Sequence, residues 1–342
     1  MTPTLATEFQ RDRPLGLDRL LGPGARTVTV AASRDPNAKV TVLLFRAGAT
    51  SPSLVVKIPT TIGAAVAVDA EAALLARLPG RLDPRLLDAV PRVVDRLPTR
   101  CGDALVTTAL RGVAMTVGYH RWRHVSRRHL VVRDFELAGH WLAQLHDVTG
   151  GPTRPIDYVG SLALRVDLRF RGAPLLDRVV QHLDGIDRRL RLETAPRTVV
   201  HGDYWAGNLL TDGTRVTGVV DWEAGLERGT PVRDVARFAL AYALSLDRHT
   251  RGGRTVAGHP GLRAGEWGAA LHYAIDGGGW FPRLLEGFTA SHLERLGITP
   301  ERWRDVLVAG VADCAVNADD DTFARHQYDV LAALARRGDD SC

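Results

Sequence analysis

A segment running from residue 199 to residue 223 constrains the fold more than any other part of the chain. Its apolar runs contain β-branched or leucine residues, which is typical of short buried strands. The Asp212-Gly213 pair is a strong turn signal between two such runs. Three short strands are therefore predicted, at residues 199–200, 209–210 and 216–220.

Four polar side chains stand where these predicted strands end. His201 and Asp203 follow the first strand, Asn208 precedes the second, and Asp221 follows the third. Mg²⁺ prefers hard oxygen ligands, so we predict Asn208 and Asp221 as its ligands. Asp203 is predicted to accept a proton from a hydroxyl, and His201 to brace the loop by hydrogen bonds. Taken singly, each acid has the alternative role of a turn or cap residue.

The spacing His201-x-Asp203-x-x-x-x-Asn208, followed by Asp221-Trp-Glu, resembles that of the aminoglycoside phosphotransferase and choline kinase family. The resemblance implies an α+β, two-lobed, protein-kinase-like fold. An antiparallel β N-lobe with one helix would precede a mostly helical C-lobe. It also implies a nucleotide-binding lobe over residues 1–110, a catalytic and acceptor-binding lobe over residues 111–342, and the cofactors ATP or GTP and Mg²⁺.

Lysine is rare in this chain, which has only Lys39 and Lys57 among 44 basic residues. Lys57 lies in the run Ser-Leu-Val-Val-Lys-Ile-Pro, an apolar strand in which a charge is costly unless it is paired. The family resemblance implies that Lys57 holds the α- and β-phosphates of the nucleotide. The alternative is an edge-strand lysine that extends its ammonium to solvent.

The expected partner of this lysine is an acid on the following helix. Apolar residues recur at helical spacing over residues 66–78, and Pro79-Gly80 ends the pattern. Glu71 resembles the glutamate that orients the phosphate-binding lysine in the family. Asp69 is the rival for this role, although an acid near a helix N-terminus is often only favoured by the helix dipole.

Further strands are predicted on both sides of this helix. Residues 26–32 and 39–45 are expected to pair around a turn, and Lys39 is expected to be a solvated residue of that turn. No Gly-x-Gly-x-x-Gly motif occurs there, unlike in protein kinases. Two more strands are predicted at residues 93–97 and 104–110. By resemblance, the backbone from Thr108 to Leu110 faces the adenine edge.

The second lobe is predicted to be helical. A long helix is expected to begin at Asp134 and to include Val148 on its apolar face, and another is expected within residues 174–192. A further helix opens at Thr230 and carries Asp234. This residue resembles the acid that braces the catalytic loop, and its alternative role is a first-turn acid favoured by the helix dipole.

The acceptor is expected to be a small hydroxylated molecule, either an antibiotic such as an aminoglycoside or a sugar or amino-alcohol metabolite. Trp205 stands where protein kinases usually have a lysine, and the short path from Asp221 to Asp234 leaves no room for an activation loop. A protein-kinase-like enzyme and a non-catalytic, pseudokinase-like nucleotide-binding module are the alternatives. The acidic acceptor candidates are Glu223, beside the predicted metal ligand Asp221, and Asp276, Asp319 and Asp320, for which the alternative is a loop or cap role.

Composition adds a few limits on partners and location. The net charge of +5 permits an anionic ligand but does not demand nucleic acid. Three scattered cysteines without a Cys-x-x-Cys motif argue against a disulfide framework or a zinc site. No apolar leader and no apolar run of about 18 residues is found. We therefore expect a cytoplasmic protein without a membrane or nucleic-acid partner, and the oligomeric state stays open.

Overall fold

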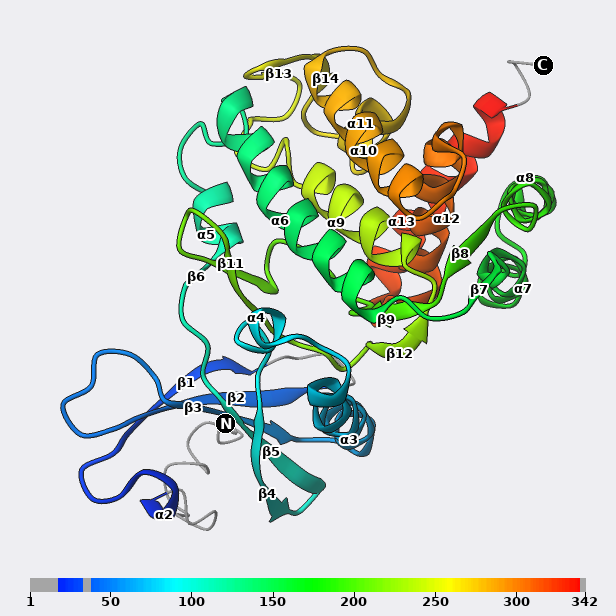
Figure 1. Ribbon diagram of the computed structural model, residues 1–342. Helices are drawn as coiled ribbons and strands as arrows, with labels where there is room; N and C mark the ends of the chain where they lie inside the picture. Colours follow the sequence, from blue (N-terminus) through cyan, green and yellow to red (C-terminus); the bar gives the residue numbers. More distant parts are fainter. Residues whose placement is uncertain (1–17, 33–37, 339–342) are drawn as a thin grey trace.

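The chain folds into two lobes, as Figure 1 shows: a small β-rich lobe and a larger helical lobe above it. The computed structural model describes residues 18–32 and 38–338. The turn predicted between the first two strands lies largely outside these residues. The predicted combination of an antiparallel N-lobe and a helical C-lobe is confirmed.

The N-lobe is built on one antiparallel sheet of five strands, in the order β1-β2-β3-β5-β4. Apolar and β-branched residues predicted these strands, and the three central strands of the sheet carry its buried positions. The first two strands have the predicted bounds. The strands are β1 (Arg26–Ala32), β2 (Lys39–Phe45), β3 (Leu54–Pro59), β4 (Val93–Thr99) and β5 (Gly102–Thr108).

The two faces of this sheet carry different kinds of side chain. Val56 and Ile58 of β3 point to one face, where they join a small apolar core with residues of β2 and β5. Because side chains alternate along a strand, Lys57 points to the opposite face. The helix α3 (Ile62–Arg77) packs on β3 and β5. The Lys57 side chain therefore lies outside the small apolar core, while its neighbours on the strand fill it.

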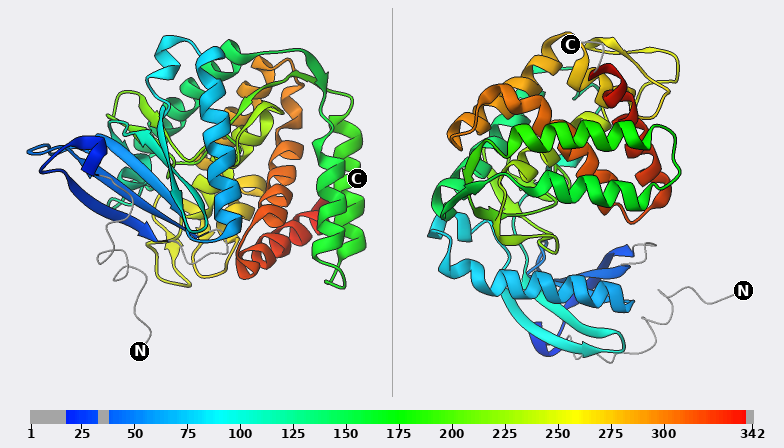
Figure 2. Two further views of the ribbon diagram at one scale, coloured as in Figure 1. Left: turned by 90° about the horizontal axis from the view of Figure 1, so that it is seen from below. Right: turned by 90° about the vertical axis from the view of Figure 1, so that its right-hand side faces the viewer.

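Helix α3 connects the two lobes. Thr61 caps its N-terminus by accepting a hydrogen bond from the backbone N–H of Ala64 at 3.0 Å. The helix starts four residues before the predicted stretch, because this cap, rather than the apolar pattern, sets its beginning. Leu74 and Leu75 are buried in the same apolar core as the C-lobe helices. Figure 2 shows α3 lying along the junction between the lobes.

The C-lobe contains helices around a continuous apolar core. The longest helix, α6, begins at Arg128 and not at Asp134 as predicted. Asp134 is instead a buried mid-helix residue that accepts hydrogen bonds from Tyr242 at 2.7 Å and pairs with His124 at 2.8 Å. Val148 is exposed, so the predicted apolar face was wrong at its end. The main helices are α6 (Arg128–Thr149), α7 (Tyr158–Arg169), α8 (Leu176–Leu190), α9 (Val232–Leu244), α10 (Ala269–Asp276), α11 (Trp280–Arg295), α12 (Trp303–Asn317) and α13 (Asp321–Gly338).

The segment at residues 199–223 forms short strands on the side of the C-lobe facing the N-lobe (Figure 1). β10 and β11 pair as an antiparallel hairpin, and β6, which directly follows the link between the lobes, adds to β10. β9 instead pairs with β12, a strand that was not predicted. Their bounds are β6 (Val113–Ala114), β9 (Thr198–Val200), β10 (Leu209–Thr211), β11 (Val216–Val219) and β12 (Leu226–Gly229).

No helix within the described residues is both long and apolar enough to cross a lipid bilayer.

Two histidines are buried where α6 packs on α11. The rings of His146 and His292 lie 6.5 Å apart, and Nε2 of His146 has no hydrogen-bond partner among the described residues. Burial, with a smaller effect from nearby charges, lowers the pKa of His146 to about 3 and that of His292 to about 4. Both rings are therefore buried in the neutral form.

This pair predicts a loss of stability in acid. An unfolded histidine, with a pKa near 6.5, binds a proton that the folded ring resists. The stability contribution is complete above pH 6.5 and is lost as the pH falls toward about 4 for His292 and about 3 for His146. Each ring is expected to cost about 1.4 kcal/mol per pH unit in this window.

Urea unfolding from pH 7 to pH 4 checks this prediction. H146L should show a clearly flatter pH dependence of the unfolding free energy than the wild type. H140Q changes an exposed histidine on the same helix and should keep the wild-type slope. An unchanged slope in H146L contradicts the prediction.

Candidate active site

An ion-pair cluster joins the two lobes. Lys57 of β3 places its Nζ 2.6 Å from both carboxylate oxygens of Glu71 on α3, and 2.8 Å from Oδ1 of Asp221 after β11. The Glu71 carboxylate also accepts a hydrogen bond from the backbone N–H of Trp222 at 3.2 Å. The structure thus brings together three predicted site residues from three separate elements. Asp69, the rival of Glu71, instead pairs with Arg96 at the surface.

The cluster fixes the charge of its members. The side chain of Lys57 is 12% exposed and that of Glu71 is 2% exposed. Burial alone would lower the pKa of Lys57, but the carboxylates of Glu71 and Asp221 outweigh it and raise that pKa. Burial likewise works against a charged Asp221, yet Lys57 and Lys39 lower the pKa of this carboxyl well below its usual range. Lysine and aspartate are therefore both ionised at neutral pH.

Lys39 belongs to the same cluster, so the prediction of a solvated turn residue was wrong. It is the first residue of β2, its side chain is only 17% exposed, and its Nζ lies 3.0 Å from Oδ1 of Asp221. It also forms an ion pair with Glu223. The pairing of Thr41 with Lys57 across β2 and β3 explains this, because residues two apart on a strand share a face.

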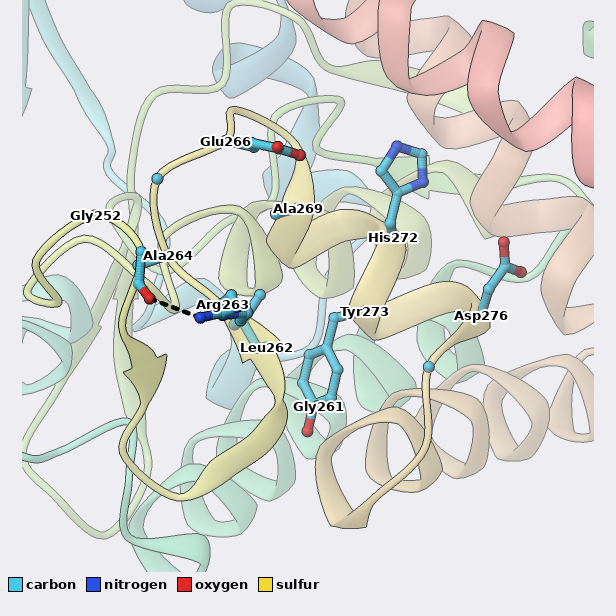
Figure 3. A pocket seen from close by; sticks show the side chains of 13 residues that line it. Gly252, Gly261, Leu262, Arg263, Ala264, Glu266, Ala269, His272, Tyr273 and Asp276 are labelled. Atoms are coloured by element: carbon cyan, nitrogen blue, oxygen red, sulfur yellow. Dashed lines mark hydrogen bonds between the residues drawn. The ribbon is translucent and has the colours of Figure 1, made fainter.

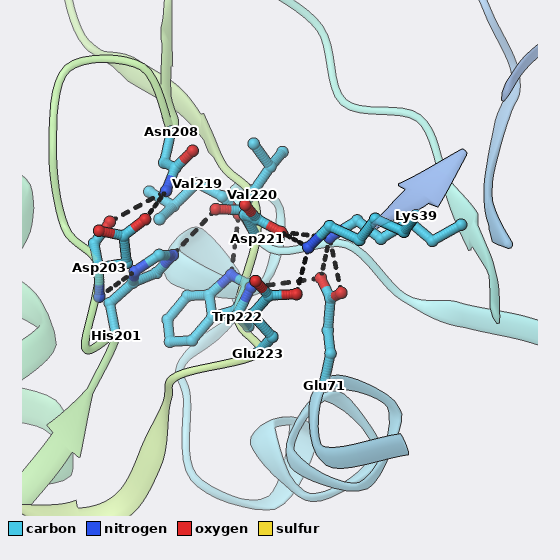
Figure 4. Close-up of polar contacts among 11 residues, drawn as sticks. Lys39, Glu71, His201, Asp203, Asn208, Val219, Val220, Asp221, Trp222 and Glu223 are labelled. Atoms are coloured by element: carbon cyan, nitrogen blue, oxygen red, sulfur yellow. Dashed lines mark hydrogen bonds and ion pairs between the residues drawn. The ribbon is translucent and has the colours of Figure 1, made fainter. Parts of the chain in front are cut away.

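The carboxylates of this cluster could hold a divalent cation. Glu71, Asp221 and Glu223 each offer an oxygen within 4.8 Å of the others (Figure 4). Asp221 has a φ of +71°, a left-handed conformation that is uncommon for a residue other than glycine. Burial, and then the neighbouring Asp221, raise the pKa of Glu223. The ammonium groups of Lys39 and Lys57 both contact Oδ1 of Asp221, at 3.0 and 2.8 Å.

A second group of polar residues lies beside this cluster. Nδ2 of Asn208 donates to the backbone oxygen and to Oδ2 of Asp203, both at 3.0 Å. In Figure 4 the amide oxygen of Asn208 points away from Asp203. This oxygen has no hydrogen-bond donor among the residues that the structure describes. An amide oxygen and carboxylate oxygens are the donor types that Mg²⁺ prefers, so the residues present fit this ion.

The second oxygen of Asp203 is held by an arginine that the sequence argument missed. Nε of Arg237 on α9 lies 2.8 Å from Oδ1 of Asp203, and its Nη2 lies 2.6 Å from the same oxygen. Nη1 of Arg237 contacts the Sγ of Cys314 at 3.0 Å. The carboxylate is thus fixed from both sides, by Asn208 and by Arg237. One sequence signal indicates this arginine: Arg237 stands three residues after Asp234 and therefore lies on the same helix face.

The loop carrying Asp203 is braced from within the C-lobe. Asp234 is fully buried and accepts hydrogen bonds from the backbone N–H groups of His201 at 2.6 Å and Gly202 at 2.8 Å. Burial raises the pKa of Asp234, while the adjacent His201 and these two N–H groups oppose the rise. The ring Nε2 of His201 contacts the backbone oxygen of Val220 at 2.9 Å. Gly202 has a φ of +81°, and a Cβ there would meet the oxygen of Ala224 at 2.1 Å.

The link between the lobes has limited backbone hydrogen-bonding capacity for a ligand. The N–H of Thr108 donates to the oxygen of Arg92 at 2.9 Å, and the N–H of Ala109 donates to that of Ser53 at 3.0 Å. In the part of the chain that the structure describes, the N–H of Leu110 has no such acceptor. Among the residues from Thr108 to Leu110, whose backbone is predicted to face the adenine edge, Leu110 therefore offers the available N–H donor.

The acidic acceptor candidates lie in different places. Glu223 is in the ion-pair cluster, and Asp320 accepts a hydrogen bond from the N–H of Phe323 at the start of α13. Asp319 is exposed just before that helix. Asp276 pairs with Arg304 at 2.8 Å.

The surroundings of Asp276 form a cavity of about 850 Å³ between α10 and the β14 strand (His259–Arg263), shown in Figure 3. In Figure 1 these elements lie at the end of the C-lobe remote from the N-lobe. Asp276 therefore lines a cavity that Asp203 does not line.

Comparison with known proteins places this arrangement among phosphotransferases. The model of the "Phosphotransferase enzyme family" matches residues 37–269. No curated protein matches the chain in sequence.

Solved structures share the fold at low sequence identity. A ternary complex of a thermostable aminoglycoside phosphotransferase APH(4)-Ia mutant with AMP-PNP and hygromycin B has a TM-score of 0.59 at 14% identity, covering 94% of this chain and 97% of that one. The gentamicin–APH(2")-IIa complex has a TM-score of 0.51 at 14% identity, covering 97% of both chains. The GDP complex of an aminoglycoside 2'-phosphotransferase-IIIa mutant has a TM-score of 0.53 at 12% identity, covering 97% of this chain and 95% of that one.

The position of Lys39 predicts how the protein responds to Mg²⁺ alone. In K39M, Asp221 and Glu223 lose a shared cation, so the metal-free protein should be destabilised by about 1–2 kcal/mol. Mg²⁺ should then raise the melting temperature of K39M more than that of the wild type, because the ion replaces the lost charge.

Thermal unfolding in EDTA and in millimolar Mg²⁺ provides the measurement. R92M removes an exposed cation from a surface pair with Asp88 and should show the wild-type response to Mg²⁺. Equal Mg²⁺ shifts in K39M and in the wild type are the result that speaks against this role of Lys39.

Proposed function

Because the chain belongs to the phosphotransferase enzyme family, we propose that it transfers a phosphoryl group from ATP or GTP, with Mg²⁺, to a hydroxyl of a small molecule. The observation that carries the proposal is the convergence of Lys57, Glu71 and Asp221 from two lobes beside Asp203 and Asn208. Phosphoryl transfer depends mainly on positioning and on neutralising charge, and this set of residues supplies both.

The nucleotide side of the proposed site is the ion-pair cluster. Lys57 is held by Glu71, so its ammonium is positioned to meet the α- and β-phosphates as a point charge. Asp221 and Asn208 are the proposed metal ligands. When bound, Mg²⁺ would neutralise part of the charge of the phosphates. The backbone N–H of Leu110 is the proposed donor to the base of the nucleotide.

The acceptor side is organised by Asp203. A carboxylate can accept about four hydrogen bonds, so its contacts with Asn208 and Arg237 leave room for the hydroxyl of the acceptor. Asp203 would orient this hydroxyl and take up its proton as the new bond to phosphorus forms. Asp234 and His201 support the loop and do not touch the reacting atoms.

The small-molecule acceptor is favoured over a protein substrate by the space around the loop. Asp221 and the start of α9 are separated by ten residues, part of which forms β12, so no long segment is present to dock a peptide. Protein kinases usually carry a lysine at the position of Trp205, so this residue also distinguishes the site from that of a protein kinase. Candidate acceptors include aminoglycosides, as in the neighbouring APH(4)-Ia and APH(2")-IIa complexes, and sugars or amino alcohols.

Replacing Asp203 tests the proposal. D203N keeps the shape of the side chain but removes its basicity, so the kcat of phosphoryl transfer should fall by about 10²- to 10⁴-fold. Binding of Mg²⁺-AMP-PNP, measured by titration calorimetry, should stay within a few-fold of the wild type, because Asp203 is not in the nucleotide cluster.

Two outcomes would contradict this assignment. Normal turnover by D203N would remove Asp203 from the chemistry. A wild-type protein that binds Mg²⁺-AMP-PNP but transfers phosphate to none of a broad set of alcohols would favour a non-catalytic binding module. K57M serves as the matched control for the other half of the site, since it should weaken nucleotide binding itself.

A further inference from the structure

Two lysines of the N-lobe sheet meet at one carboxylate oxygen of the C-lobe. Nζ of Lys39 lies 3.0 Å and Nζ of Lys57 lies 2.8 Å from Oδ1 of Asp221. The two nitrogens are therefore at most 5.8 Å apart, the sum of these two contacts. Figure 4 shows the Lys39 side chain extending to this carboxylate. Since the chain has no other lysine, both of its lysine ammonium groups gather at this point.

The sheet fixes the backbone of Lys39, so a change of partner involves the side chain alone. Lys39 pairs with Pro59 in the register of β2 with β3. The backbone N–H of Thr60 donates to the oxygen of Ala38 at 3.1 Å, and the hydroxyl of Thr60 donates to the same oxygen. These contacts tie the start of β2 to the end of β3. The flexible four-carbon stem of the lysine can then carry its ammonium from one partner to another.

The two lysines differ in what holds them. Lys57 is held within the N-lobe, because both carboxylate oxygens of Glu71 lie 2.6 Å from its Nζ. Among the residues that the structure describes, the carboxylate partners of Lys39 are Asp221 and Glu223, and both belong to the C-lobe. Asp221 is also the proposed ligand of Mg²⁺. An ion bound there would weaken the hold on Lys39, while Lys57 would keep Glu71.

Two ammonium groups this close to each other need an anion beside them. Lysine is charged at neutral pH, and the side chain of Lys39 is only 17% exposed, so water screens its charge little. The carboxylate of Asp221 now supplies the anion for both lysines. Once a metal ion shares that carboxylate, a further anion is needed at the same point. The phosphates of a nucleotide are such an anion.

Resting on the proposed phosphotransfer, we propose that Lys39 is a second phosphate-binding lysine, whose ammonium leaves Asp221 and Glu223 for the phosphates when the Mg²⁺-nucleotide binds. The phosphates of a nucleotide are joined in a chain through bridging oxygens. A chain held by Lys57 therefore lies within reach of an ammonium at most 5.8 Å away. Lys39 thus ties the lobes together in the nucleotide-free protein and neutralises phosphate charge in the loaded one.

The sign of the effect on nucleotide affinity separates this role from that of a simple tie between the lobes. If Lys39 only paired with Asp221 and Glu223, K39M would free these carboxylates for Mg²⁺ and tighten nucleotide binding. If Lys39 binds phosphate, K39M should weaken the binding of Mg²⁺-AMP-PNP or Mg²⁺-GMP-PNP by about tenfold or more. The matching nucleoside, which has no phosphate, should bind K39M within about twofold of the wild type.

Titration calorimetry in millimolar Mg²⁺ measures the nucleotides, and displacement of the bound nucleotide measures adenosine or guanosine. K39R keeps the positive charge and should retain most of the wild-type affinity. R46M removes an exposed cation just beyond the other end of β2 and should behave as the wild type. Melting curves in Mg²⁺ confirm that each variant is folded at the temperature of the titration.

Selective ¹³C labelling of the lysine Cε atoms gives a direct readout, because the chain has only two lysines. K39R assigns the Lys39 signal by its absence. Mg²⁺-nucleotide should shift this signal beyond the change that Mg²⁺ alone produces. Mg²⁺ with the nucleoside should leave it at its Mg²⁺-only position.

The possible outcomes separate this proposal from the one on which it rests. Tighter or unchanged binding of Mg²⁺-nucleotide by K39M, an equal loss for the nucleoside, or a Lys39 signal that moves no further than with Mg²⁺ alone each overturn the role of Lys39. All three leave phosphotransfer standing. A folded wild type that binds neither Mg²⁺-AMP-PNP nor Mg²⁺-GMP-PNP overturns the proposed function itself.

Discussion

The ion pair between Lys57 and Glu71, closed by Asp221, is the contact on which the rest of the site depends. Each member comes from a different element, β3, α3 and the end of β11, so the cluster forms only when both lobes are correctly packed. The cost of burying these charges is high, and it is met only because each has a partner at hydrogen-bond distance. Removing any one of them would leave the others buried and uncompensated.

The charges of the extended cluster do not cancel. Glu71, Asp221 and Glu223 contribute three formal negative charges, and Lys39 and Lys57 contribute two positive ones. One negative charge is left, at the point where Asp221 adopts a left-handed backbone conformation. Both features are typical of a site that is arranged for a ligand rather than for stability alone. The surplus charge and the strained backbone are consistent with the proposed place of a divalent cation.

The sequence could predict the parts of this site that are local. Asn208 and Asp221 lie at the ends of strands that a turn signal brings together, and the rarity of lysine drew attention to Lys57. Lys39 and Arg237 could not be placed in the same way. The role of Lys39 depends on the register of β2 against β3, and that of Arg237 on the docking of α9 under the loop. No local sequence pattern predicts the position of Lys39 or Arg237, because tertiary packing determines both positions.

The surroundings of Asp221 and of Asp203 differ in electrostatic character. On one side carboxylates and ammonium groups gather around Asp221, a setting suited to phosphates and a metal ion. On the other side Asp203 meets Arg237, and beyond this pair the wall of a small cavity lined by Arg237 and Trp205 is largely apolar. Arg237 thus separates the two environments, because it balances the charge of Asp203 and lines the cavity. The contact with Arg237 therefore holds the proposed base in place and leaves the wall beyond it without an unbalanced charge.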